Sequence, residues 1–311
     1  MVIDKLIPLW AKFRNRHLAL ILKQPSYAVG LALLFSLMPY TLCFSLMMIA
    51  LVTLRKGIKP GLVVFFPVLL LQVAMSMTSM SWSIAVFNAL AELMPCLFAA
   101  AVLRQTQSWQ MMACGFFVCI WAGALVLQNF YPGFVEAQFF YFKNMMQTLP
   151  KDHEWLTYFN AVKSTHADAL GHYFFGTQSM IMVLMSVLPV LVARKWQSEL
   201  FYPGGFKQEM LSFRADRMVL LVFFVVLYAA FKEHAMAIDV FPLLLLYLTA
   251  TGLSLIFYIL CHKNMAFLTS IMIVGLLLKP FVMIPAFVIL GLLDGLFNFR
   301  LYLPFGAGKT T

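Results

Sequence analysis

The sequence predicts an all-α protein, a polytopic transmembrane helical bundle, from its composition and its long apolar segments. Of its 311 residues, 63% are hydrophobic and 11% are charged, and the mean hydropathy is +0.89. The apolar segments repeatedly reach the ~20 residues that a helix needs to cross a bilayer. No alternating pattern typical of a membrane barrel is present. We therefore expect about 9–10 membrane segments, including a broken or re-entrant N-terminal hairpin, with the lipid bilayer as the first partner.

The first 26 residues are predicted to form a basic, amphipathic cytoplasmic segment. Apolar residues alternate here with Lys12, Arg14, Arg16 and Lys23, which is typical of a helix on an anionic membrane surface. A cap that packs on the bundle fits the pattern equally well. No short apolar core ends in a small-residue cleavage site, so no cleavable signal peptide is predicted.

The first apolar segment, Tyr27 to Leu54, is predicted to be two short helices. A single straight helix would be about 40 Å long, which exceeds a hydrocarbon core of about 30 Å. Pro39 lies near its centre, and proline disfavours helix at the preceding residue. We expect helices over 27–38 and 41–54. Basic residues flank both ends, so both ends should lie on the same, cytoplasmic side.

The other membrane segments follow from the apolar stretches that remain. Together with the first two helices they make one predicted helical domain over residues 27–300. They are expected at 61–80, 82–103, 109–131, 169–193, 218–231, 240–261, 266–278 and 281–299.

The distribution of basic residues predicts the topology and accounts for the net charge of +10. Both termini, the loop 194–217 and the tail 301–311 are expected to be cytoplasmic, because most Lys and Arg residues then lie inside. The aromatic loop 132–168 is expected to be outside. Because the membrane topology accounts for the positive net charge, we predict no nucleic-acid partner.

Residues for catalysis or for a cofactor are sparse. The five cysteines show no metal-site spacing, and no nucleotide-binding or hydrolase motif is present. We expect no enzyme activity, no catalytic residues, no metal and no cofactor. His166, Asp168 and His172 are close in sequence, and this cluster could serve metal or proton binding or could simply face solvent.

Polar residues inside apolar segments predict the candidate substrate site. Glu92 lies in mid-span with Asn88 four residues earlier on the same helix face. With Trp82 and Asn129 they make up the predicted site for an unknown small molecule. An interhelical hydrogen bond of protonated Glu92 is the structural alternative. For Asp294 we expect a structural cap or ion pair, and for Gln72 and Asn129 interhelical hydrogen bonds.

Two further sets of residues are candidates for docking a partner. Ala28 and Ala32 form a small face on the first short helix, which allows close approach by a helix of this chain or of another. Lys207, Arg214 and Arg217 lie in the cytoplasmic loop.

Four sequence motifs carry a resemblance to a known family. The cytoplasmic loop carries Tyr202-Pro203-Gly204-Gly205-Phe206-Lys207-Gln208-Glu209, and the C-terminal segment reads Gly291-Leu292-Leu293-Asp294-Gly295-Leu296-Phe297-Asn298-Phe299-Arg300. The other two are Glu92-Leu93-Met94-Pro95 and Gly252-Leu253-Ser254-Leu255-Ile256-Phe257. All four resemble motifs of the YybS-like family of predicted bacterial membrane proteins. The resemblance covers about residues 27–300; the basic N-terminal segment and the outer loop have no counterpart in it.

The early region, with its broken hairpin and Arg55-Lys56-Gly57 turn, is distantly similar to the substrate-binding S subunits of energy-coupling-factor transporters. This similarity implies a bacterial inner-membrane subunit that binds a small molecule and docks on an ATPase and coupling-subunit module. The alternative is a non-transporting scaffold or assembly factor that acts through the cytoplasmic loop.

Overall fold

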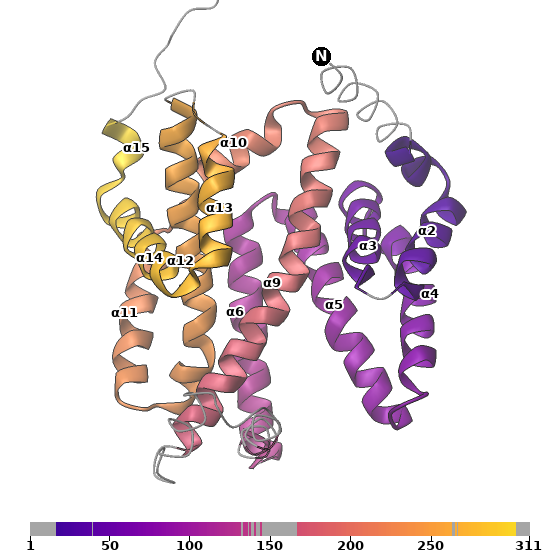
Figure 1. The fold of residues 1–311 in the computed structure, drawn as a ribbon, viewed down its shortest axis with the longest axis horizontal. Coiled ribbons are helices and arrows are strands. Elements are labelled where there is room, and N and C mark those ends of the chain that lie inside the picture. Colours follow the sequence, from indigo (N-terminus) through magenta and orange to yellow (C-terminus); the bar gives the residue numbers. More distant parts are fainter. Residues whose placement is uncertain are drawn as a thin grey trace, which may run out of the picture. The chain divides into compact units, whose positions relative to one another are not determined.

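The computed structural model describes residues 17–38, 40–131, 167–262 and 267–302, with positions 133–135, 137, 140, 144 and 265. Every regular element in these residues is α-helical, which confirms the all-α prediction (Figure 1). Among these described residues, six helices are long and apolar enough to cross a membrane, or seven if the bent pair His17–Lys23 and Pro25–Leu37 is one span. The chain is thus a multi-pass membrane protein by the length and composition of its helices.

The chain divides into two compact units, whereas the sequence predicts one domain over residues 27–300. Unit 1 comprises residues 1–112 and 181–208, and unit 2 comprises residues 113–180 and 209–311. Three helices cross from one unit to the other: α6 (Trp109–Phe130), α9 (Ala167–Phe201) and α10 (Gly205–Ser212).

Unit 1 is built around four helices that pack on one another. They are α2 (Pro25–Leu37), α3 (Leu42–Lys56), α4 (Ile58–Ser76) and α5 (Trp82–Thr106). Helix α3 is at its centre, with every residue from Ser45 to Leu54 buried. All four helices begin and end within a few residues of the predicted segments.

The break in the first apolar segment is confirmed. Helix α2 ends at Leu37, Met38 is extended, and Tyr40 adopts a φ of 65°. The hydroxyl of Thr41 donates hydrogen bonds to the carbonyls of Phe35 and Met38. These bonds satisfy carbonyls that the end of a helix leaves without a partner.

A tight turn at Gly57 joins α3 to α4. Basic residues of unit 1 lie near this turn. Gly57 has a φ of 108°, which favours glycine. Arg104, in the last turn of α5, donates to the carbonyl of Thr53 at 3.2 Å. Arg194 of α9 donates to Gln107 at 3.3 Å. The ends of α3, α5 and α9 therefore meet, as the charge distribution predicts.

The described part of the N-terminal segment is a short helix, His17–Lys23, bent by 117° from α2. Its apolar residues Leu18, Ile21 and Leu22 are buried. This burial agrees with the predicted alternative of a cap that packs on the bundle; residues 1–16 lie outside the described part.

Unit 2 contains α11 (Arg217–Phe231), α12 (Ala235–His262), α13 (Leu268–Leu278), α14 (Pro280–Phe297) and α15 (Phe299–Tyr302). Helix α12 is central and packs against α11, α13 and α14. At 1.5 Å per residue, α11 and α13 are only about 22 and 17 Å long, which is too short for a straight crossing of a core of about 30 Å.

Glycines bring α12 and α14 into close contact. A methyl group at Gly252 would collide with the Phe287 carbonyl, and one at Gly291 would lie 2.5 Å from the Leu248 carbonyl oxygen. Helix pairs in membranes gain from such small surfaces, because dispersion contacts and not hydrophobic burial drive their association.

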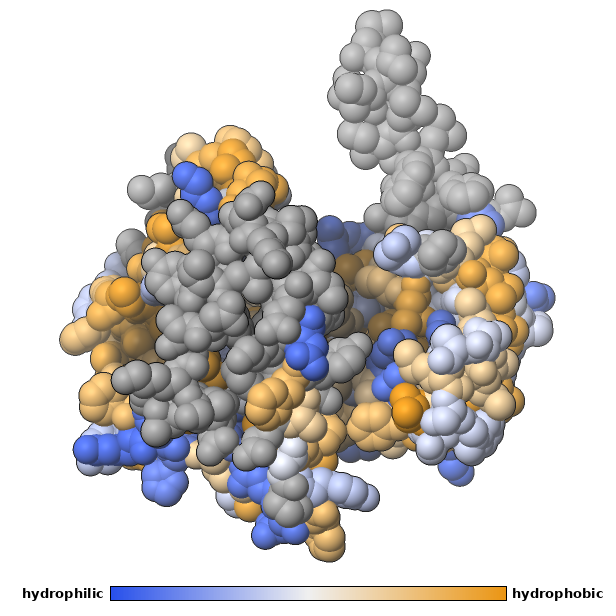
Figure 2. Space-filling model, turned by 60° about the horizontal axis from the view of Figure 1, so that its bottom comes forward, coloured by the Kyte–Doolittle hydropathy of each residue, from blue (hydrophilic) through white to orange (hydrophobic). Residues whose placement is uncertain are grey.

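The outer surface is rich in apolar side chains (Figure 2). Leu277, Leu278, Phe281 and Phe231 are each more than 75% exposed. In a soluble protein such a surface would aggregate, whereas in a bilayer it contacts lipid.

We predict that Gly252→Ala destabilises the protein by about 1–3 kcal/mol, because the added methyl group overpacks the α12–α14 contact. The matched control is Gly123→Ala in α6, where no atom lies within 4 Å of the added carbon. That change should leave stability unchanged or raise it by up to about 1 kcal/mol. Unfolding of both variants in detergent, by heat or by SDS, measures the difference. Equal stability of the two variants would contradict the α12–α14 packing.

Candidate functional site

Glu92 lies on the surface of α5 with no hydrogen-bond partner among the described residues. Asn88, one turn earlier, is half-buried and donates to the sulfur of Met80 at 3.4 Å. Glu92 is the eleventh of the 25 residues of α5. At 1.5 Å per residue it lies about 15 Å from the start of the helix, which is about half the thickness of a hydrocarbon core. The carboxyl group of Glu92 is therefore in the middle of the apolar helix.

The packing of α3 on α5 gives the level of Glu92 in unit 1. The Cys96 thiol donates to the Leu46 carbonyl at 3.5 Å, and Arg104 to the Thr53 carbonyl at 3.2 Å. The two helices thus run in the same direction with a nearly constant register. By this register, Glu92 is level with the first residues of α3, where the first apolar segment is broken.

The other two predicted substrate-site residues, Trp82 and Asn129, are exposed. Trp82 is the first residue of α5 and is 62% exposed. Asn129 lies on α6 in unit 2, and its amide donates to the Leu125 carbonyl of its own helix at 2.8 Å. Asn129 therefore bonds within its own helix, whereas the sequence predicts a hydrogen bond between helices.

The small face of α2 is filled by helices of the same chain. Ala28 and Ala32 are fully buried, and α2 packs on α3 and α4. The Ser45 hydroxyl of α3 donates to the Ala32 carbonyl at 2.5 Å. Gln72 of α4 donates to the Ser36 hydroxyl at 2.8 Å, as predicted for an interhelical hydrogen bond.

The second polar cluster joins α6, α9 and α12 inside unit 2. Asp239 is 1% exposed and is hydrogen-bonded to two side chains. Nε2 of Gln128 donates to Oδ2 at 3.1 Å, and Nδ1 of His172 lies 2.8 Å from Oδ1. We name these three side chains the Asp239 cluster.

Sequence reasoning missed Asp239 and gave His172 a different neighbour. The predicted cluster of His166, Asp168 and His172 rests on nearness in sequence; His166 and the side chain of Asp168 lie outside the described part. His172 is 14% exposed and pairs with a residue 67 positions away. The sequence did contain a signal for Asp239, because this carboxylate directly precedes the predicted membrane segment 240–261.

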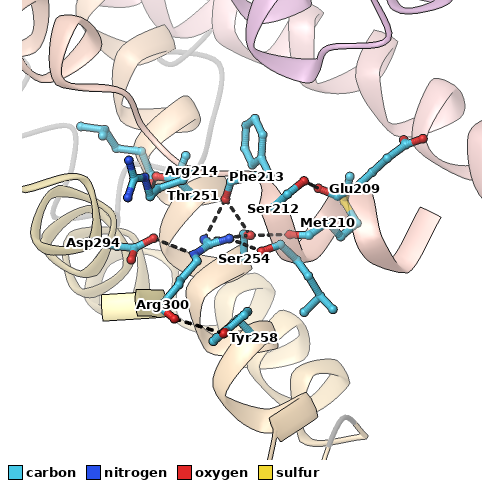
Figure 3. Close-up of polar contacts among 12 residues, drawn as sticks. Glu209, Met210, Ser212, Phe213, Arg214, Thr251, Ser254, Tyr258, Asp294 and Arg300 are labelled. Atoms are coloured by element: carbon cyan, nitrogen blue, oxygen red, sulfur yellow. Dashed lines mark hydrogen bonds and ion pairs between the residues drawn. The ribbon is translucent and has the colours of Figure 1, made fainter. Parts of the chain in front are cut away.

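The third polar cluster ties the C-terminal helices to the loop between α10 and α11 (Figure 3). Arg300 donates to the Asp294 carboxylate at 3.0 Å and to the Phe213 carbonyl at 2.8 Å, and it also donates to the Leu211 carbonyl. Ser254 of α12 donates to that same Phe213 carbonyl at 2.8 Å. The ion pair predicted for Asp294 is confirmed.

Electrostatics explain why Asp294 and Arg300 need one another. Asp294 is fully buried, and the side chain of Arg300 is 10% exposed. Burial lowers the pKa of the Arg300 guanidinium, and the Asp294 carboxylate opposes that shift. One carboxylate oxygen, Oδ1 of Asp294, has no partner in the described residues. We therefore assign the Asp294–Arg300 pair a structural role.

Two of the predicted docking residues, Arg214 and Arg217, follow Phe213 of this third cluster in the chain. Lys207 and Arg217 are exposed, and Arg214 is half-buried. The carbonyl of Arg214 accepts a hydrogen bond from the Tyr247 hydroxyl at 3.4 Å. Lys207 belongs to unit 1, while Arg214 and Arg217 belong to unit 2.

All five cysteines are free thiols. Within the described ranges, no group of three or more His, Cys, Asp or Glu side chains could hold a metal ion. The candidate sites are therefore the unpaired Glu92 with Asn88 in unit 1 and the Asp239 cluster in unit 2.

No family model, curated protein sequence or solved structure matches this chain.

We predict that Arg300→Met destabilises the protein by about 3–5 kcal/mol, because it leaves the Asp294 charge buried without its partner. The double variant Asp294→Leu with Arg300→Met should recover much of that loss, since it removes both charges. Arg217→Met, at an exposed position, serves as the control and should be near neutral. Thermal unfolding in detergent measures all three, and a double variant as unstable as Arg300→Met would argue against the ion pair as the cause.

Proposed function

We propose that this protein is a small-molecule-binding or transport subunit of a membrane, with Glu92 and Asn88 at its binding site. The observation that carries the proposal is that Glu92 lies in mid-helix with no partner in the described residues. The two buried aspartates of unit 2 are, in contrast, each paired with a basic or polar side chain.

The free energy of a carboxylate at this depth supports a functional role for Glu92. Its insertion costs roughly 2.5–3.5 kcal/mol at a helix centre, so a protein gains by giving it a partner or a water-filled cavity. A bound polar molecule or cation would supply that partner, and Asn88 would add a donor and an acceptor one turn away.

The proposed setting is the bacterial inner membrane, with both termini in the cytoplasm. Support comes from the basic residues that gather where α3, α5 and α9 end, because cytoplasmic loops are enriched in Lys and Arg. The resemblance to YybS-like proteins and to S subunits of energy-coupling-factor transporters points the same way. Since the sequence has no nucleotide-binding motif, a separate ATPase module would supply the energy.

Because Ala28 and Ala32 are buried in the chain's own core, such a module would dock elsewhere. The exposed basic residues Lys207 and Arg217 are the stronger candidates.

The alternative is a non-transporting scaffold that binds a partner through the loop 194–217. One observation favours it: Arg300 and Ser254 hold the carbonyls of this loop, while Lys207 and Arg217 stay exposed. A loop that is already held in one conformation loses less conformational entropy on binding than a mobile loop does.

We expect gentle release of the full chain from its own membranes, followed by native mass spectrometry, to show a retained small molecule. Glu92→Gln and Asn88→Ala should each lower its occupancy about 10-fold or more, which corresponds to the loss of about 1.4 kcal/mol. The control Glu233→Gln, an exposed carboxylate between α11 and α12, should retain it. Full occupancy in folded Glu92→Gln and Asn88→Ala would refute the site.

The same spectra test the alternative. A stable non-ATPase partner with no retained small molecule would favour the scaffold. Charge reversal at Lys207, Arg214 and Arg217 should then release that partner, and a partner that stays bound would contradict docking through the loop.

A further inference from the structure

We propose that the Asp239 cluster is a proton-binding site, at which His172 takes up one proton that Asp239 stabilises. Its components come from three helices: Gln128 from α6, His172 from α9 and Asp239 from α12. The proposal is separate from the site around Glu92, which lies in the other unit.

We assign the state before uptake as an ionised Asp239 beside a neutral His172. Gln128 donates to one carboxylate oxygen, and Nδ1 of His172 lies 2.8 Å from the other. With the imidazole proton on Nδ1, both oxygens of the carboxylate accept a hydrogen bond, and Nε2 keeps a lone pair that can take a proton.

Charge balance gives the reason for uptake. With neutral His172 the cluster has a net charge of −1, and Asp239 is 1% exposed. A proton from a hydronium ion binds at Nε2 and leaves a water molecule, and the net charge becomes zero. A buried ion pair is less costly than a single buried charge.

The exposed fractions of the two side chains indicate that His172, and not Asp239, exchanges protons with the surroundings. The side chain of His172 is 14% exposed, against 1% for Asp239. Protons can therefore reach the imidazole from outside the packed helices, whereas the carboxylate of Asp239 is almost completely buried.

The backbones of α9 and α12 are in close contact beside the cluster. Gly176, one turn after His172, packs α9 against the carbonyls at the start of α12. A methyl group at Gly176 would lie 2.6 Å from the Asp239 carbonyl oxygen and 3.0 Å from that of Ile238. The pair that takes up the proton therefore lies at a tightly packed contact between these two helices.

The other titratable groups on the packed helices leave His172 as the partner of Asp239. Helix α6 carries no acidic or basic residue. On α9 the nearest groups are Tyr173 and Asp168, and the side chain of Asp168 lies outside the described part. The turn between α11 and α12 carries Lys232, Glu233 and His234. Of the ion pairs among described residues, the one that involves Asp239 is with His172.

The donor set selects a proton over a metal ion. The cluster offers one imidazole and one carboxylate that already has two donors. A transition-metal site takes three or four such ligands, and the described residues hold no group of three.

Histidine ¹⁵N NMR on the full chain in nanodiscs, titrated from about pH 8 to about pH 5, tests the proposal. The signals of His172 are those lost in His172→Gln. We expect His172 to carry its proton on Nδ1 at the upper end and to gain a second proton as the pH is lowered. Asp239→Asn should abolish the Nδ1 preference and change the titration, while His234→Gln should leave both unchanged.

Two results would overturn the proposal: one protonation state of His172 at every pH, or an unchanged His172 titration in folded Asp239→Asn. If Asp239→Asn does not fold, Gln128→Leu removes one donor only and should still change the titration. Glu92→Gln should leave the His172 signals as they are, so failure of the substrate site and failure of the proton site give different results.

Discussion

The whole structure depends on one constraint: in lipid, polar groups must find their partners within the protein. Backbone groups do so through helices, and the breaks in the helices are where the chain has to find other partners. Thr41 donates hydrogen bonds to carbonyls at the end of α2, and Arg104 donates one to a carbonyl at the end of α3, near Gly57. Arg300 and Ser254 do the same for the loop after α10. Each break is therefore a place where a side chain from a distant part of the sequence is required.

The same constraint separates structural from functional polar residues. Asp294 and Arg300 satisfy one another and also hold backbone carbonyls, so their charges serve the fold. Gln72 joins two helices through Ser36. Glu92 has no such role, although it lies deep in an apolar helix. The Asp239 cluster is intermediate, because it is well bonded yet contains the histidine of the proposed proton site.

Small residues set how closely the helices approach, and with it where the polar groups meet. Gly252 and Gly291 let α12 and α14 touch along their backbones, which brings Ser254 and Asp294 within reach of the same arginine. Gly176 does the same for α9 and α12 beside Asp239. In each case the site depends on the absence of a side chain, a feature that composition does not reveal.

The sequence by itself determined the helical class, the approximate bounds of the long apolar helices, the break between α2 and α3, and the gathering of basic residues at one end of unit 1. These follow from apolar length, from the chemistry of proline and from charge, all of which are local. Only the tertiary structure decided that Ala28 and Ala32 face their own chain and that contacts gather in two units. It also decided that His172 pairs with Asp239 and not with a sequence neighbour. The physical reason is that these choices depend on which helix faces pack together, and partners 67 residues apart leave no local signal of their contact.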